Sequence, residues 1–255
     1  MVEAGPRKKR RAGWRPLWVF AIVGVIVAGT VTFRTWRNLR QSYPQVAELG
    51  REQGIPALEA GEFDRAHQLL QPAKQAVNAL GGQVEGADEI RSAADEAALY
   101  VALATVGLEE MLDEAAIASN PAQWTSRFED RHKGRGVVID SRIASTPEGP
   151  KGRYEIDYIV MPAEESGDFR AGGARPSRSA RIDFKGFELF ELAQPKVGDR
   201  VVFGARLRSF EFDPDANAWV VRLEPASGLF VRFHKALESL GWPDEDAFAD
   251  PGVEP

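Results

Sequence analysis

The sequence predicts a membrane-anchored α+β protein, with one transmembrane helix, an α-helical hairpin module and a five- to six-stranded antiparallel small β-barrel. Three observations predict this class: an uncharged apolar run near the N-terminus, apolar residues at helical spacing up to about residue 118, and short alternating segments between turn residues beyond residue 134. The chain accordingly divides into a basic cytoplasmic tail (1–16), a transmembrane helix (17–36), an acidic helical module (43–118), a connecting segment (119–133), a β-barrel-like domain (134–241) and a disordered acidic tail (242–255).

The transmembrane helix is predicted from the run Leu17–Phe33, which contains no charged residue. A helix rises about 1.5 Å per residue, so roughly 20 residues cross a hydrocarbon core of about 30 Å. Aromatic rings prefer the two membrane borders, and this places the anchoring residues at Trp14, Trp18, Phe33 and Trp36. A cleaved signal peptide is disfavoured, because the small residues Val27-Ala28-Gly29 are followed by further apolar sequence.

The orientation of this helix follows from the basic residues on its two sides. Six Lys and Arg residues precede Leu17, and three follow Phe33 within a few positions. Because the side richer in Lys and Arg stays in the cytoplasm, the N-terminus is expected inside and the later domains outside. The expected location is therefore the cell inner membrane, single-pass, with the lipid bilayer as one partner.

The acidic module, residues 43–118, has apolar residues at helical spacing and Gly at expected helix ends. Gly61, Phe63 and Ala66, followed by Leu70 and Ala73, resemble the turn and second helix of one tetratricopeptide repeat over residues 44–80. In that family, small residues allow two antiparallel helices to approach closely, and stacked repeats form a peptide-binding groove. The resemblance therefore implies contacts with a protein partner. A generic helical hairpin is the alternative.

The β region is predicted from alternation and turn residues. One face of the fourth strand is expected to carry Val201, Phe203, Ala205 and Leu207, since strand side chains alternate. Gly186 is expected to bend the third strand, as a barrel requires at a corner. The predicted strands are Gly136–Ile143, Arg153–Met161, Ala180–Glu191, Arg200–Phe212 and Ala218–Leu223, with a short sixth segment Leu229–Arg232.

Five strands with one bend over about 100 residues resemble an OB-type barrel in arrangement. The resemblance implies an exposed strand face that binds an extended polymer, either nucleic acid or glycan. The candidate ligand face comprises Arg206, Arg208, Phe210 and Arg222, because bases stack on aromatic rings and phosphates need positive charge. Cross-strand ion pairing is the alternative role for these arginines.

Composition excludes disulfide-stabilised folds, cysteine nucleophiles and metal sites built from cysteine. The chain has no cysteine, and its three histidines (His67, His132, His234) have no metal-site spacing. We therefore expect no catalytic, cofactor-binding or metal-binding residues, and a non-enzymatic protein. The β region that carries the candidate ligand face is net negative, and the expected topology places it outside the cytoplasm. Both points argue against a nucleic-acid partner. The leading hypothesis is a binding or scaffolding protein of a bacterial envelope, with a protein partner of unknown identity, and with polymer binding as the alternative. The oligomeric state is left open.

Overall fold

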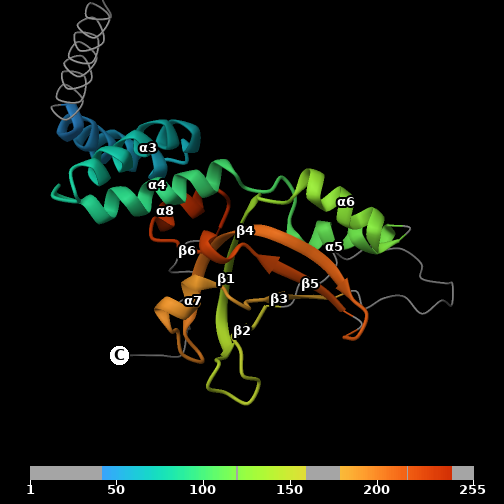
Figure 1. Cartoon of the computed structure of the whole chain (residues 1–255). Coiled ribbons are helices and arrows are strands. Elements are labelled where there is room, and N and C mark those ends of the chain that lie inside the picture. The colour runs from blue at the N-terminus through green and yellow to red at the C-terminus, as the bar shows by residue number, and fades with distance from the viewer. Residues whose placement is uncertain (1–41, 119, 159–178, 217, 243–255) are drawn as a thin grey trace, which may run out of the picture.

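The computed structural model describes residues 42–118, 120–158, 179–216 and 218–242. These ranges form an α+β fold in which helices precede and cover a six-stranded open sheet (Figure 1), so the predicted mixture of helices and strands is confirmed. None of the helices within these ranges is both long enough and apolar enough to span a bilayer. The predicted membrane helix and its four aromatic anchors lie outside the described residues.

The helical part begins with a tight hairpin. Residues 42–49 are helical and continue through a π-helical turn into α2, and Gly61, at φ 77°, makes the turn into α3. A Cβ added at Gly50 would lie 2.2 Å from Cβ of Ala73, so only glycine lets the two helices approach this closely. The helices are η1 (Gly50–Gly54), α2 (Ile55–Glu59), α3 (Phe63–Ala79), α4 (Ala87–Val101), α5 (Leu108–Ile117) and α6 (Pro121–Arg131).

The sheet has the strand order β2-β1-β4-β5-β3, and β6 pairs with β4. Two short helices, α7 (Glu188–Ala193) and α8 (His234–Glu238), and one 3-10 turn, η2 (Pro225–Ser227), interrupt the strands. The strands are β1 (Gly136–Ser145), β2 (Glu155–Ile156), β3 (Ala180–Asp183), β4 (Arg200–Asp213), β5 (Ala218–Leu223) and β6 (Leu229–Phe230).

The predicted closed, all-antiparallel barrel is wrong in two respects. Its outermost strands, β2 and β3, form no ladder with each other in the described ranges, so the sheet is open. In addition, β3 pairs with β5 in parallel. Parallel neighbours need a crossover connection, and the chain supplies one through α7 and β4.

The predicted third strand, Ala180–Glu191, is correct only to Asp183. Beyond it Gly186 adopts φ 72° in a turn, and the chain then forms α7. Phe184, Phe187 and Phe190 are all buried and in mutual ring contact, and their spacing of three residues fits turns and helices rather than a strand. The spacing of these three aromatic residues therefore indicated the turn and α7, but the apolar alternation of the segment led to the prediction of a strand.

Two apolar layers hold the fold together. The inner face of the sheet packs on α5, α6 and α7, with Trp124 and Phe128 of α6 and Phe203 of β4 fully buried. On the other face, Val138 and Val202 pack against the cluster of the helical module. Figure 1 shows α4 on this side of the sheet. The helical module and the β region consequently share a core.

The start of α6 provides a simple stability test. Asn120 is the N-cap: its side-chain oxygen accepts a hydrogen bond of 2.8 Å from the backbone N–H of Gln123, and Pro121 follows at the first helical position. Asn120→Ala is expected to lower the free energy of unfolding by about 1 kcal/mol, because that N–H loses its partner. Asn120→Asp should retain the cap and unfold at nearly the wild-type denaturant concentration. Equal losses for both variants in chemical denaturation would contradict the capping role.

Candidate functional site: the groove along β1

The four residues of the predicted ligand face do not form a common surface. Arg206 is half-buried, and its guanidinium donates hydrogen bonds to the backbone carbonyls of Gly134 (2.9 Å) and Ala98 (3.4 Å). Arg208 and Arg222 are exposed on β4 and β5. Phe210 is 1% exposed and lies in edge-to-face contact with Trp124 and Trp219, so its predicted outward orientation is wrong.

A β-bulge explains the position of Phe210. The register of β4 against β5 shifts between Leu207 and Ser209, where Leu207 is opposite Leu223 and Ser209 is opposite Arg222. One extra residue in a strand reverses the facing of every residue after it. Leu207 and Phe210 therefore both face the core, which a strict period of two cannot reproduce.

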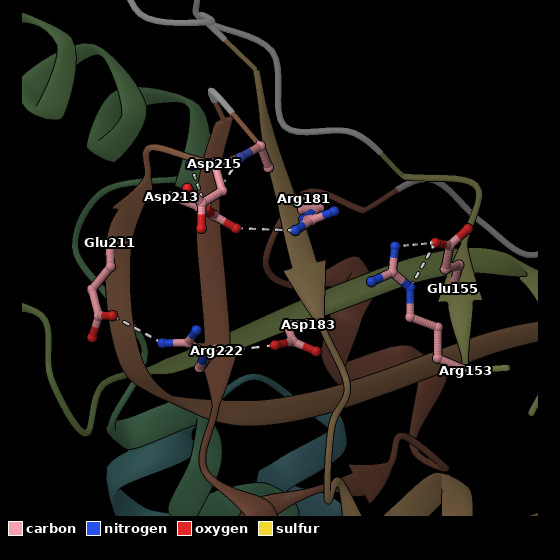
Figure 2. Close-up of polar contacts among 9 residues, drawn as sticks. Arg153, Glu155, Arg181, Asp183, Glu211, Asp213, Asp215 and Arg222 are labelled. Carbon is pink, nitrogen blue, oxygen red and sulfur yellow. Dashed lines mark hydrogen bonds and ion pairs between the residues drawn. The ribbon is translucent and has the colours of Figure 1, made fainter. Parts of the chain in front are cut away.

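Figure 2 shows the polar face on which Arg222 lies. Arg222 bridges Glu211 of β4 (2.9 Å) and Asp183 of β3 (3.5 Å), and Arg181 reaches Asp213 at 3.4 Å. These cross-strand pairs balance positive with negative charge, as the pairing alternative in the sequence analysis expected. Exposed pairs of this kind contribute about 0–1 kcal/mol each. The face is therefore a solvated surface without an unpaired arginine cluster among the drawn residues.

A cleft of about 400 Å³ lies between the two outer strands of the sheet. On its β2 side Arg153 donates to Glu155, and Lys151 also binds that carboxylate; the Lys151 hydrogen bond is the main reason why the pKa of Glu155 is lowered. On its β3 side are Arg181 and Asp183, as Figure 2 shows across the gap. Because both signs of charge line this cleft, it carries no clear ligand preference.

A larger groove, of about 790 Å³, runs along β1 between the helical module and the sheet. Its floor is the first half of β1, and one wall is the connection between α4 and α5. That connection is held to β1 by hydrogen bonds from Ala104 N–H to Gly136 O (2.9 Å) and from Gly136 N–H to Ala102 O (2.7 Å). The lining residues are 103–109, 136–140, Tyr158, Leu240 and Trp242.

The floor of this groove includes backbone groups of β1 that point away from β4. Gly136 turns its N–H and C=O away from β4, and Arg142 turns its C=O outward to Asp157 N–H at 2.8 Å. Because strand groups alternate in direction, Val138 and Asp140 also point their backbone groups outward, into the groove. No backbone partner for those groups occurs among the described residues.

The lining of the groove is mostly apolar, and its charged side chains are both acidic. Tyr158 donates a hydrogen bond of 2.6 Å to Glu109, and burial, followed by this carboxylate, raises the pKa of Tyr158 above its ordinary value. Asp140 accepts two hydrogen bonds from Arg200, of 3.0 and 2.7 Å. Both acidic side chains of the lining therefore have a partner in the described structure, Tyr158 for Glu109 and Arg200 for Asp140.

The described ranges contain no group of three or more His, Asp or Glu side chains that could hold a metal ion. His67, His132 and His234 lie in α3, after α6 and at the start of α8 respectively. His132 is buried beside Trp124 and Phe128, and burial lowers its pKa.

Comparison of the chain with protein-family models, curated proteins and solved structures found no match. The resemblances to a tetratricopeptide repeat and to an OB-type barrel therefore rest on the residues quoted above. Sequence reasoning missed the groove, because it depends on where the end of α4 meets β1. One local signal was present in the sequence. Gly136 begins β1 shortly after α6, and a glycine at the start of a strand can mark a close approach of another backbone.

Proposed function

We propose that this chain is a non-enzymatic, membrane-anchored binding or scaffolding protein of a bacterial envelope. The apolar run Leu17–Phe33 would hold it in the inner membrane, with the N-terminus in the cytoplasm and residues beyond about 40 outside. The basic tail suits the anionic cytoplasmic leaflet, and the acidic helical module would be repelled by it.

The single observation that supports a binding role is the groove along β1. It lies between the helical module and the sheet, and its lining is mostly apolar. A concave surface of this volume with a mostly apolar lining favours an interaction site. Residues 103–109 at the end of the helical module form one wall of the groove. This position is consistent with the proposal that the helical module contacts a protein partner.

Membrane topology tests the anchor. We expect a reporter that is active only outside the cytoplasm to be active when fused after Pro255, and a reporter active only inside to be silent. Replacing the five basic residues 7–11 by glutamine should reduce or reverse this difference, because three basic residues would then remain after the apolar run and one before it. A matched control replaces five exposed charges of the acidic module instead and should leave the orientation unchanged. An inside signal from the wild-type chain would overturn the proposed location.

A further inference from the structure

We propose that residues 232–242, called the strap from here on, are held closed over the apolar surface of the helical module by Glu96. The strap opens as the pH rises, while the rest of the fold stays intact. It follows β6 and contains α8. Its opening bears on the proposed binding role, because Leu240 and Trp242 of the strap line the groove, and only this consequence for binding rests on the proposed function.

A buried carboxyl group ties the strap to the helical module. Glu96 of α4 is 1% exposed, and its two oxygens accept backbone hydrogen bonds from Arg232 (2.7 Å) and Phe233 (3.3 Å). Both donors lie at the start of the strap, so the strap lies directly against this carboxyl group. A negative charge at Glu96 is costly in the closed state and becomes hydrated when the strap moves away.

The groups around Glu96 set the direction of the pH response. Tyr100 of α4 donates to Oε2 at 3.4 Å, and the positive charge of Arg232 also favours the carboxylate. Other charged groups on the surrounding elements are bound elsewhere: Lys235 to Glu59 of α2, Lys74 of α3 to Asp95, and Arg206 of β4 to the carbonyls of Ala98 and Gly134. Burial outweighs the stabilising contacts and raises the pKa of Glu96 to about 7. Loss of the proton therefore favours the open strap.

The strap covers apolar side chains of α2 and α4. Ala236 and Leu237 are buried in one cluster with Leu58, Ala97 and Tyr100, and α8 lies beside α4 (Figure 1). Opening would expose this cluster on the module that is proposed to contact a protein, and would remove part of the lining of the groove. A protein partner would therefore meet different surfaces in the closed and open states.

The strap can open without breaking the sheet. All six strands precede it in the chain, and Val231, just before it, keeps its own hydrogen bond to Val202 O at 3.0 Å. The backbone N–H groups of Ala236 and of residues 239–242 bond to carbonyls within the strap. Since α8 has five residues and isolated helices shorter than about 12 residues are marginal in water, the strap depends on its contacts with the module.

The test uses the full-length chain in nanodiscs, with one cysteine introduced as a reporter, since the natural sequence contains none. Ala236→Cys places a thiol in the strap, and Ala205→Cys places one on β4; both alanines are 0% exposed. The rate of reaction with a soluble thiol reagent is measured at pH 6 and pH 8. Each rate is divided by that of the same variant in denaturant at the same pH, which removes the pH dependence of the thiol itself.

The normalised rate of Ala236→Cys should rise about tenfold from pH 6 to pH 8, because the pKa of Glu96 is about 7 in the closed state and has its ordinary value of 4.5 when the strap is open. Ala205→Cys should react at least about tenfold more slowly at both pH values, because its thiol is reached only through global unfolding. Low concentrations of denaturant should accelerate Ala205→Cys steeply and Ala236→Cys weakly, since strap opening exposes less surface.

Control variants assign the pH response to Glu96. Glu96→Gln, combined with Ala236→Cys, stays neutral and should make the normalised rate independent of pH. His234→Gln removes the histidine of the strap and should leave the tenfold rise in place. Leu237→Cys, at a position 5% exposed, repeats the measurement if Ala236→Cys does not fold.

Three results would overturn the proposal: a labelling rate that is the same at pH 6 and pH 8, a pH response that survives Glu96→Gln, or equal normalised rates for Ala236→Cys and Ala205→Cys. The last result would mean that the strap opens only when the whole chain unfolds. Because labelling requires neither a partner nor a particular topology, each of these results would leave the proposed function standing. A reporter signal from inside the cytoplasm would, in turn, leave the strap proposal standing.

Discussion

Replacing Gly204 by valine is expected to lower the free energy of unfolding by about 3 kcal/mol, because the site has no room for a side chain. Gly204 lies on β4 beneath the end of α4, where a Cβ would lie 2.0 Å from Cδ2 of Leu99. A Cβ at Gly136, on the neighbouring strand, would lie 2.9 Å from Cδ1 of the same leucine. Leu99 is 3% exposed, so its side chain has nowhere to move.

A double-mutant cycle makes this prediction specific. Leu99→Ala should cost about 2–5 kcal/mol, because it leaves a cavity between helix and sheet. Gly204→Ala should be destabilising in the wild type but close to neutral in the Leu99→Ala background, since the new methyl group would enter that cavity. Denaturant unfolding followed by tryptophan fluorescence gives the four free energies. Additive losses would show that Leu99 and Gly204 do not pack against each other.

The same contact shows why sequence reasoning reached the elements but not their assembly. The predicted module 43–118 is helical and contains α4 and α5, and Ala218–Leu223 is a strand as predicted. In both cases the spacing of apolar residues matches the period of the element that forms. Gly204 and Leu99, by contrast, are 105 positions apart, and neither carries a local sign of the other. Long-range packing of this kind fixes where α4 lies on the sheet, and the groove depends on that placement.

The ligand face predicted from the sequence is wrong for a more local reason. Period two correctly predicts Val201, Phe203, Ala205 and Leu207 on the buried face of β4, up to the bulge. Beyond it the phase reverses, so Phe210 joins the core and the four predicted residues separate. Arg208 is the exposed residue at the bulge, and positions 205–212 around it contain no glycine or proline to indicate one.

Glu96 is expected to make the stability of the protein fall as the pH rises from 5 to 8. Its side chain is 1% exposed on α4, and its carboxylate accepts backbone hydrogen bonds from Arg232 N–H (2.7 Å) and Phe233 N–H (3.3 Å). Burial raises the pKa of Glu96 to about 7, against the lowering effect of these hydrogen bonds and of the Arg232 charge. The Tyr100 hydroxyl also donates a hydrogen bond of 3.4 Å to Oε2 of Glu96.

The direction of this pH dependence follows from proton binding in the folded and unfolded states. Between the ordinary carboxyl pKa and about 7, the folded chain binds a proton at Glu96 that the unfolded chain has released. The stabilisation is therefore complete when the pH lies below the pKa of Glu96 in the unfolded chain. It is lost as the pH rises through the pKa of Glu96 in the folded chain, about 7. The shift corresponds to about 3 kcal/mol in total, of which about 2–3 kcal/mol should be lost between pH 5 and 8.

Glu96→Gln isolates this contribution. Glutamine stays neutral and its amide oxygen can accept from Arg232 N–H, so it imitates the uncharged, protonated acid. His132 opposes the trend in wild type and variant alike, because its lowered pKa makes stability rise with pH in the same range. The difference between the two pH–stability curves therefore reports Glu96 alone, and parallel curves would show that its carboxyl group titrates as if exposed.

Glu96→Ala separates the hydrogen bonds from the charge. It removes the acceptor for two backbone N–H groups that precede α8, and about 2–4 kcal/mol should be lost even at pH 5, where glutamate is protonated in the folded chain. Because Leu240 and Trp242 follow α8 and line the groove, the loss should reach the groove as faster amide exchange over residues 229–242. Unchanged exchange there, with stability lowered, would mean that Glu96 supports α4 without holding the C-terminal wall in place.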